Sequence, residues 1–150
     1  MVMLPDKITG YHTEFIELND ENHSVTSPQT NIYNCIAWAV GEDGVWWWPD
    51  STHQAFWPED VKREVTVEAF AEAFISLGYE LCDDGDYEAD FQKIVLYVSA
   101  FFAPTHAAKQ LDERLWSSKL GKSFDIEHEL NALNSKTYGS PKVFFKKRVL

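Results

Sequence analysis

Cys35 and His106 are the two residues of the sequence that can act as a nucleophile and its base. Cys35 follows the polar stretch 26–31 and lies in the apolar segment 32–40, which Gly41 ends, so a short helix is predicted there. Unpaired backbone N–H groups at the start of a helix favour the thiolate, which is the nucleophilic form. His106 opens a predicted strand, from which an imidazole can accept the thiol proton. The alternatives are an ordinary buried cysteine and an ordinary polar residue at a strand start.

The elements that would position this pair follow from the hydrophobic pattern. A helix is predicted over residues 66–77, where apolar residues recur every three or four positions and Gly78 supplies the stop. A second helix is expected over residues 125–133. Strands are expected at residues 79–82, 93–99, 106–111, 115–118 and 142–149. Helices followed by antiparallel strands predict an α+β fold, with N-terminal helices packed on an antiparallel sheet.

Length and charge exclude several classes of protein. The 150 residues indicate one domain, 1–150, with a core from about residue 26. A formal charge of −11 argues against a nucleic-acid groove, and the basic residues near the C-terminus are interpreted as a solvated strand end. No apolar run approaches the roughly 20 residues that span a membrane. The N-terminus shows no secretory signal, so a soluble, cytoplasmic protein is expected, as a monomer or weak dimer.

Cysteine count and motif content predict no metal and no cofactor. Cys35 and Cys82 are expected to be free thiols in a reducing compartment. The acidic run 83–90 lacks the spacing of a calcium-binding loop. The sequence contains no CxxC, HExxH, glycine-rich phosphate loop or GxSxG motif.

The order of a cysteine at a helix start followed by a histidine at a strand start resembles the papain-like superfamily, and within it the small NlpC/P60 and CHAP branches. The NlpC/P60 resemblance places the third catalytic group about twelve positions after His106, at Ser118, where that branch usually has His, Asn or Gln. Asp125 is an alternative, and His128 a poorer one. The resemblance also implies an oxyanion donor about six residues before the cysteine, at Gln29, and Asn34 is an alternative donor.

A second resemblance covers roughly residues 31–139. The segments Tyr33–Ala39, Trp46–Pro49, Thr105–Ala108, the SKLG stretch ending at Gly121, and Asp125–His128 are similar to a family of small, uncharacterised bacterial domains. This resemblance implies that Cys35, His106, Ser118 and Lys119 belong to one site. Trp38, Trp48 and Lys119 complete the expected substrate-binding set, in which tryptophans wall a cleft.

Two functions follow from these observations. The first is a papain-like cysteine hydrolase or acyltransferase, in which Cys35 attacks an amide, ester or isopeptide carbonyl of a peptide or acyl substrate and His106 transfers the proton. The second is a catalytically inactive binding module, of the kind found in immunity proteins or inhibitors, on a papain-like fold. The charge of −11 would steer such a module to a basic protein partner.

Overall fold

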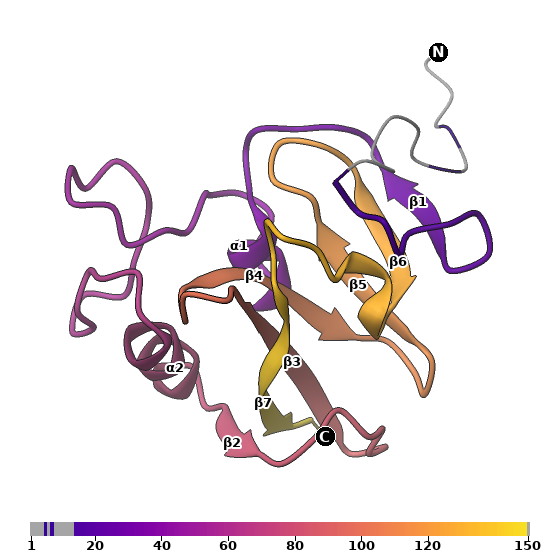
Figure 1. Ribbon diagram of the computed structural model, residues 1–150. Helices are drawn as coiled ribbons and strands as arrows, with labels where there is room; N and C mark the ends of the chain where they lie inside the picture. Colours follow the sequence, from indigo (N-terminus) through magenta and orange to yellow (C-terminus); the bar gives the residue numbers. More distant parts are fainter. Residues whose placement is uncertain (1–4, 6, 8–13, 150) are drawn as a thin grey trace.

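The computed structural model describes residues 5, 7 and 14–149, and its centre is one antiparallel sheet of seven strands (Figure 1). The strands lie in the order β1-β6-β5-β4-β3-β7-β2, and each neighbouring pair is antiparallel. Their bounds are β1 His23–Ser27, β2 Glu80–Cys82, β3 Phe91–Val98, β4 Pro104–Gln110, β5 Leu115–Lys119, β6 Asp125–Glu129 and β7 Ser140–Arg148.

Two short α-helices, α1 (Cys35–Ala39) and α2 (Val67–Ser76), and one 3-10 turn, η1 (Leu130–Leu133), are the helical elements of the described residues. The fold is therefore mostly β, and the prediction of an α+β, papain-like arrangement is wrong. One reason is that the apolar segment 32–40 gives only five helical residues. In the part of the chain that the structure describes, no helix combines the length and apolar character needed to cross a membrane.

A second reason is that residues 125–129 form a strand and not the first turns of a helix. β6 lies between β1 and β5 and pairs with both. Ile126 and His128 are buried and Glu127 is half-buried, which is the two-residue period of a strand. Pairing along both edges outweighs the helical spacing of the apolar residues, because strand formation depends mainly on tertiary context.

The other predicted elements are confirmed by β2, β3, the β4–β5 hairpin, β7 and α2. The Thr66 side chain caps α2 by accepting a hydrogen bond from the Ala69 N–H at 3.1 Å. The helix ends before Gly78, whose φ of +98° is accessible to glycine. Phe74 on its apolar face packs against Phe145 of β7, with 5.0 Å between ring centroids.

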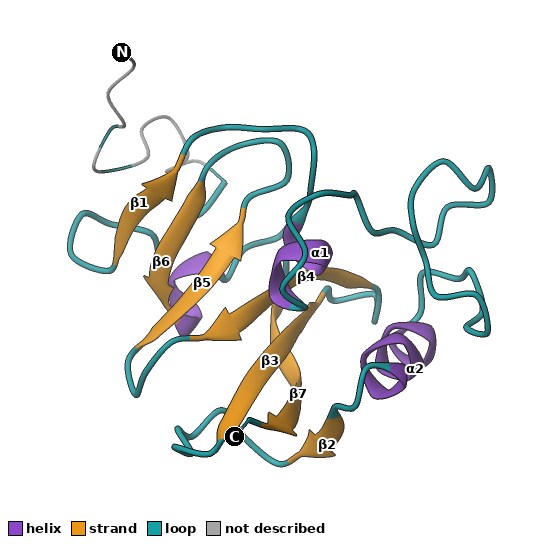
Figure 2. Cartoon of the chain, turned by 180° about the vertical axis from the view of Figure 1, so that it is seen from behind, coloured by secondary structure: helices purple, strands orange, loops and turns teal. Residues whose placement is uncertain are grey.

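The sheet has an apolar core on each face. The α-helices lie on one side of the sheet and η1 lies on the other (Figure 2). Side chains alternate along β3, so Ile94 and Leu96 point to one face and Val95 and Tyr97 to the other. Both α-helices pack on the Ile94 face, which we call the helix face. The segment around Phe15 and the turn η1 cover the Val95 face, which we call the far face.

Candidate functional site

Cys35 is the first residue of α1, and Asn34 fixes its position. The Asn34 side-chain oxygen accepts hydrogen bonds from the backbone N–H groups of Ala37, at 3.3 Å, and Trp47, at 3.0 Å. The Asn34 amide donates to the Trp47 carbonyl at 2.7 Å. Asn34 therefore caps the helix and ties it to the tryptophan-rich segment, and these backbone contacts occupy its side chain.

The Cys35 thiol is buried, with 6% of the residue exposed. Burial raises the pKa of this thiol to about 11, although the backbone N–H groups of Ala107 and Ile36 and the charge of Lys119 act in the opposite direction. Burial has this effect because a low-dielectric environment disfavours the charged form. Cys35 is therefore a protonated thiol at neutral pH.

His106 lies on the opposite face of the sheet from Cys35. Side chains alternate along β4, so Ala107 points to the helix face and packs in the same cluster as Cys35, whereas His106 points to the far face. There the imidazole stacks on Tyr138 with 4.2 Å between ring centroids, and lies edge-to-face with Tyr97 at 5.2 Å. The structure thus does not bring the predicted nucleophile and its base together.

Ser118 lies between two imidazoles on the far face. Its Oγ is 2.9 Å from His106 Nε2 and 2.6 Å from His128 Nε2. His128 Nδ1 is 2.8 Å from the Glu129 carbonyl, which can only accept, so Nδ1 carries the hydrogen and Nε2 accepts from the Ser118 hydroxyl. The hydroxyl oxygen in turn accepts from His106 Nε2–H. The structure brings Ser118 to His106 and adds His128 to the same network, which we call the His–Ser–His chain.

Both imidazoles of the His–Ser–His chain are neutral. Burial lowers the pKa of His106 well below its usual range and lowers the pKa of His128 to about 4. The remaining ring nitrogen, His106 Nδ1, is buried and has no hydrogen-bond partner among the described residues. With all three side chains inaccessible to solvent, the hydroxyl of Ser118 is held as a structural link between two rings.

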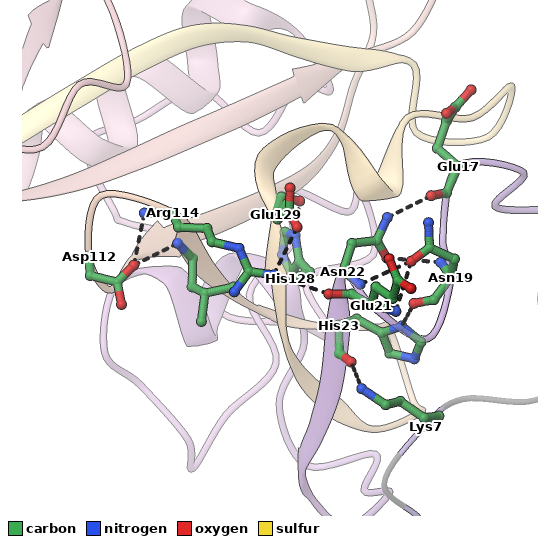
Figure 3. Close-up of polar contacts among 11 residues, drawn as sticks. Lys7, Glu17, Asn19, Glu21, Asn22, His23, Asp112, Arg114, His128 and Glu129 are labelled. Carbon is green, nitrogen blue, oxygen red and sulfur yellow. Dashed lines mark hydrogen bonds and ion pairs between the residues drawn. The ribbon is translucent and has the colours of Figure 1, made fainter.

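The end of β6, where the Glu129 carbonyl fixes the tautomer of His128, is held in place by the loop before β1 and by the β4–β5 turn (Figure 3). Arg114 donates to the Glu129 carboxylate at 2.9 Å and to the Glu21 carbonyl at 3.1 Å. The Asp112 carboxylate shapes the turn by accepting from the Arg114 backbone N–H at 2.9 Å. These contacts hold the backbone at Glu129, whose carbonyl accepts from His128.

A second buried polar group lies on the helix face. Tyr33 donates its hydroxyl hydrogen to Asp125 at 2.7 Å. Lys119 lies opposite Asp125 in the register of β5 and β6. Its ammonium group donates to the Thr30 carbonyl at 2.8 Å and to the Gly121 carbonyl. The other carboxylate oxygen of Asp125 is buried with no hydrogen-bond partner among the described residues. Asp125 and Lys119 therefore share a face with Cys35 and not with the imidazole that Asp125 was predicted to orient.

A family of related sequences matches residues 24–146, a range that contains both polar groups. The chain belongs to the DUF7689 family, a domain of unknown function. The expectation of an uncharacterised domain family covering most of the chain is thus confirmed. No curated protein and no solved structure matches the chain.

The other predicted binding residues of this DUF7689 domain have separate surroundings. Gln29 is exposed in the loop before α1. The Trp38 indole donates to the Ser117 hydroxyl at 2.9 Å. Trp48 packs edge-on against Phe70 of α2, with 5.4 Å between ring centroids. The structure does not gather these side chains into one oxyanion or substrate-binding cluster.

The acidic loop 83–90 of the DUF7689 domain is paired with lysines. Lys93, whose side chain is buried, lies 2.9 Å from Glu88 and 3.3 Å from Asp84, and Lys146 lies 3.3 Å from Glu88. In the described part of the chain, no group of three or more His, Cys, Asp or Glu residues could hold a metal ion. Of the candidate residues, His106, Ser118 and His128 form one buried polar group, and Lys119 and Asp125 belong to another on the opposite face of the sheet.

Proposed function

We propose that this domain is a protein-binding module, and that a basic protein docks on the turn between β3 and β4. The observation that carries the proposal is the exposure of two adjacent aromatic side chains, Phe101 at 91% and Phe102 at 83%. A single exposed apolar residue needs no explanation, whereas a contiguous exposed apolar patch marks an interaction surface. Aromatic anchors also dominate the binding energy of many protein interfaces.

The backbone of this turn is strained and firmly held. Phe102 has a φ of +62°, in the left-handed region that costs a bulky residue roughly 1–3 kcal/mol. The Ser99 carbonyl accepts from the Phe102 N–H at 3.0 Å, and the Ser99 hydroxyl accepts from the N–H groups of Phe101 and Ala103 at 3.3 Å. A turn fixed in this way presents both rings in one conformation, which lowers the entropy cost of binding.

A groove of about 560 Å³ separates the turn from the start of α2. Residues 65–68 form one wall and residues 101–103 form the other. Val65 is also exposed, so the apolar surface continues from the turn across the groove. The groove is the place where we expect an apolar side chain of the partner to insert between the phenyl rings and α2.

Charge favours a basic partner over an acidic one. The chain carries a formal charge of −11, and Glu68 is exposed in the lining of the groove. Glu64, which precedes Val65, is exposed as well. Opposite charge accelerates the encounter of two proteins, and like charge rejects wrong partners. An immunity protein or an inhibitor is a module of this kind.

Hydrolysis or acyl transfer of an amide, ester or isopeptide bond by a papain-like Cys35–His106 pair has less support. The two side chains lie on opposite faces of the sheet, and the pKa of Cys35 is raised, not lowered. A nucleophilic cysteine requires a populated thiolate near its base. We therefore place binding ahead of catalysis.

The test compares the proteins that the wild-type chain captures with those that a Phe101→Ser, Phe102→Ser double variant captures. Leu81→Ser, at an exposed apolar position on β2, is the matched control. A captured protein is then purified and titrated calorimetrically at two salt concentrations. We expect a basic partner whose affinity falls by at least about tenfold in the double variant and weakens with salt.

Two results would contradict the proposal. One is that no purified protein binds with an affinity that depends on the two phenylalanines. The other is an equal loss of affinity in Leu81→Ser, because that residue lies outside the proposed surface.

A further inference from the structure

We propose that the loop spanning residues 46–55 is a carbohydrate-binding site that takes a neutral pyranose ring, independently of the protein-binding surface. A cavity of about 380 Å³ lies in this loop. It is lined by Trp46, Trp48, Asp50, Thr52, Gln54 and Ala55. The loop belongs to the long connection that projects beside α1 in Figure 1, ahead of α2. Small-molecule sites combine such aromatic walls with a few well-placed polar groups.

The backbone that carries the two tryptophans is held by hydrogen bonds to Phe56. Trp47 between them is buried and packs on Phe56, with 4.6 Å between ring centroids. The Trp48 N–H donates to the Phe56 carbonyl at 3.0 Å, and the Phe56 N–H donates to the Trp46 carbonyl at 2.8 Å. Trp46 and Trp48 both line the cavity, on either side of Trp47 in the chain. Both are half-buried, so part of each indole remains open to a ligand.

The polar wall is preorganised around the Asp50 carboxylate. This group accepts hydrogen bonds from the Thr52 hydroxyl at 2.7 Å and from the backbone N–H groups of Gln54 and Ala55 at 2.8 and 3.1 Å. Arg63 donates to the same carboxylate at 3.1 Å and to the Ala55 carbonyl at 3.0 Å. A loop tied by this many contacts does not have to be ordered when a ligand binds.

The charge balance of the cavity selects a neutral ligand. The hydrogen bonds that Asp50 accepts, first from Thr52, hold the pKa of its carboxyl well below the usual range, so the group is anionic. Arg63 forms an ion pair with the Asp50 carboxylate at 3.1 Å. Because Arg63 neutralises this charge, the cavity offers no unpaired carboxylate to an ammonium ligand. A desolvated cation would need such a partner.

The remaining groups match the two surfaces of a sugar. An indole face can cover the apolar C–H face of a pyranose, and the amide of Gln54 can both donate to and accept from its hydroxyls. Gln54 is exposed and lines the cavity. The adjacent His53 has a φ of +57°, and backbone strain of this kind in a well-tied loop is typical of functional sites.

The test is a glycan array probed with the full chain, followed by calorimetric titration with the neutral glycan that binds most strongly. We expect Trp46→Ala and Gln54→Leu each to weaken that affinity by about tenfold or more. Trp46 is preferred to Trp48, whose ring also packs on Phe70. Phe101→Ser, in the protein-binding surface, is the matched control and should leave glycan affinity unchanged. Thermal denaturation establishes that each variant is folded.

Three results would overturn the assignment. The first is that no neutral glycan binds above background. The second is an affinity that neither Trp46→Ala nor Gln54→Leu changes. The third is tighter binding of a trimethyllysine peptide than of any neutral glycan, which would assign the cavity to a cation. None of these results bears on protein binding, because that surface is probed by different residues.

Discussion

The two faces of the sheet bury polar side chains of different kinds. The helix face holds a thiol with a raised pKa, Cys35, together with Lys119 and Asp125. The far face holds two neutral imidazoles bridged by the hydroxyl of Ser118. Neighbours in sequence are separated by this division, because consecutive side chains of a strand point to opposite faces. A cysteine, a histidine and a serine in suitable order therefore do not form a site unless their side chains lie on the same face of the sheet.

The two faces should also respond to opposite changes of pH. On the far face burial keeps imidazoles unprotonated, so acid acts against the folded state. On the helix face burial keeps a thiol protonated, so alkali acts against it. We therefore expect a loss of stability in acid from the far face and a loss of stability in alkali from the helix face.

The largest expected effect is loss of stability in acid through His106 and His128. The unfolded chain protonates these groups below about pH 6.5, whereas folded His128 does so only near pH 4. Stability is therefore complete above pH 6.5 and falls as the pH approaches 4, because the unfolded state binds more protons. The loss from His128 alone is about 3 kcal/mol, and His106 adds to it in the same direction. Urea denaturation at pH 7.5 and pH 4.5 measures it.

His128→Gln is the variant that isolates this contribution. It removes one buried imidazole, so the difference in unfolding free energy between the two pH values should shrink. Carboxyl groups with lowered pKa, such as that of Asp50, contribute mainly below this window. An unchanged acid dependence in His128→Gln would show that the far face does not control it.

The next largest effect is loss of stability in alkali through Cys35. The thiol ionises near pH 9 when the chain is unfolded and near pH 11 when it is folded. Stability is thus complete below pH 9 and falls by about 2.7 kcal/mol as the pH rises to 11, since the folded state then binds the extra proton. Denaturation at pH 8 and pH 10.5, compared between wild type and Cys35→Ala, measures this component. Buried tyrosines contribute equally to both proteins and cancel.

The same thiol pKa predicts that iodoacetamide does not alkylate Cys35 in the folded chain near neutral pH. Cys82 is half-buried and serves as the internal control. Mass spectrometry of the peptides should show modification of Cys82 before Cys35. Alkylation of Cys35 with an apparent pKa well below about 8.5, raised by His106→Ala, would instead restore the proposal of a catalytic pair.

Secondary structure could be predicted where the local pattern and the tertiary contacts agree. In α2 the spacing of Phe70 and Phe74 matches the face that packs on the sheet, so the helix was identified from sequence. In β6 they disagree, because the helical spacing from Ile126 onward competes with pairing to β1 and β5. β1 itself was missed, since its polar sequence gives little hydrophobic signal and its pairing partner is a distant segment.

The candidate site was predictable only within one hairpin. The predicted hairpin of β4 and β5 puts His106 and Ser118 on neighbouring strands, and the NlpC/P60 resemblance had implied that the two residues belong to one site. The position of Cys35 was not predictable, because the face on which a helix docks depends on the whole core. Ala107 lies under α1, but Ala108 is equally small on the far face, so residue size does not distinguish the two sides. His128, named from the sequence only as a poorer alternative to Ser118, joins the same network because residues 125–129 form a strand and not a helix.

The smallest expected effect compares two adjacent serines, one on each face. Ser118 makes hydrogen bonds to two buried imidazoles, and Ser117 makes one to the half-buried indole of Trp38. Ser118→Ala leaves two buried ring nitrogens without partners and should cost about 2 kcal/mol of unfolding free energy. Ser117→Ala removes one weaker bond and should cost about 1 kcal/mol or less. Denaturation of both variants at pH 7.5 measures the difference.

The adjacent positions make this comparison a strict one, since both substitutions remove one oxygen from a buried residue of the same strand. A difference in stability must then come from what each hydroxyl contacts. Equal losses would mean that the imidazoles find other partners when the hydroxyl is absent. In that case Ser118 would not be the link that holds the two rings, and the far face would be no more dependent on its polar contacts than the helix face.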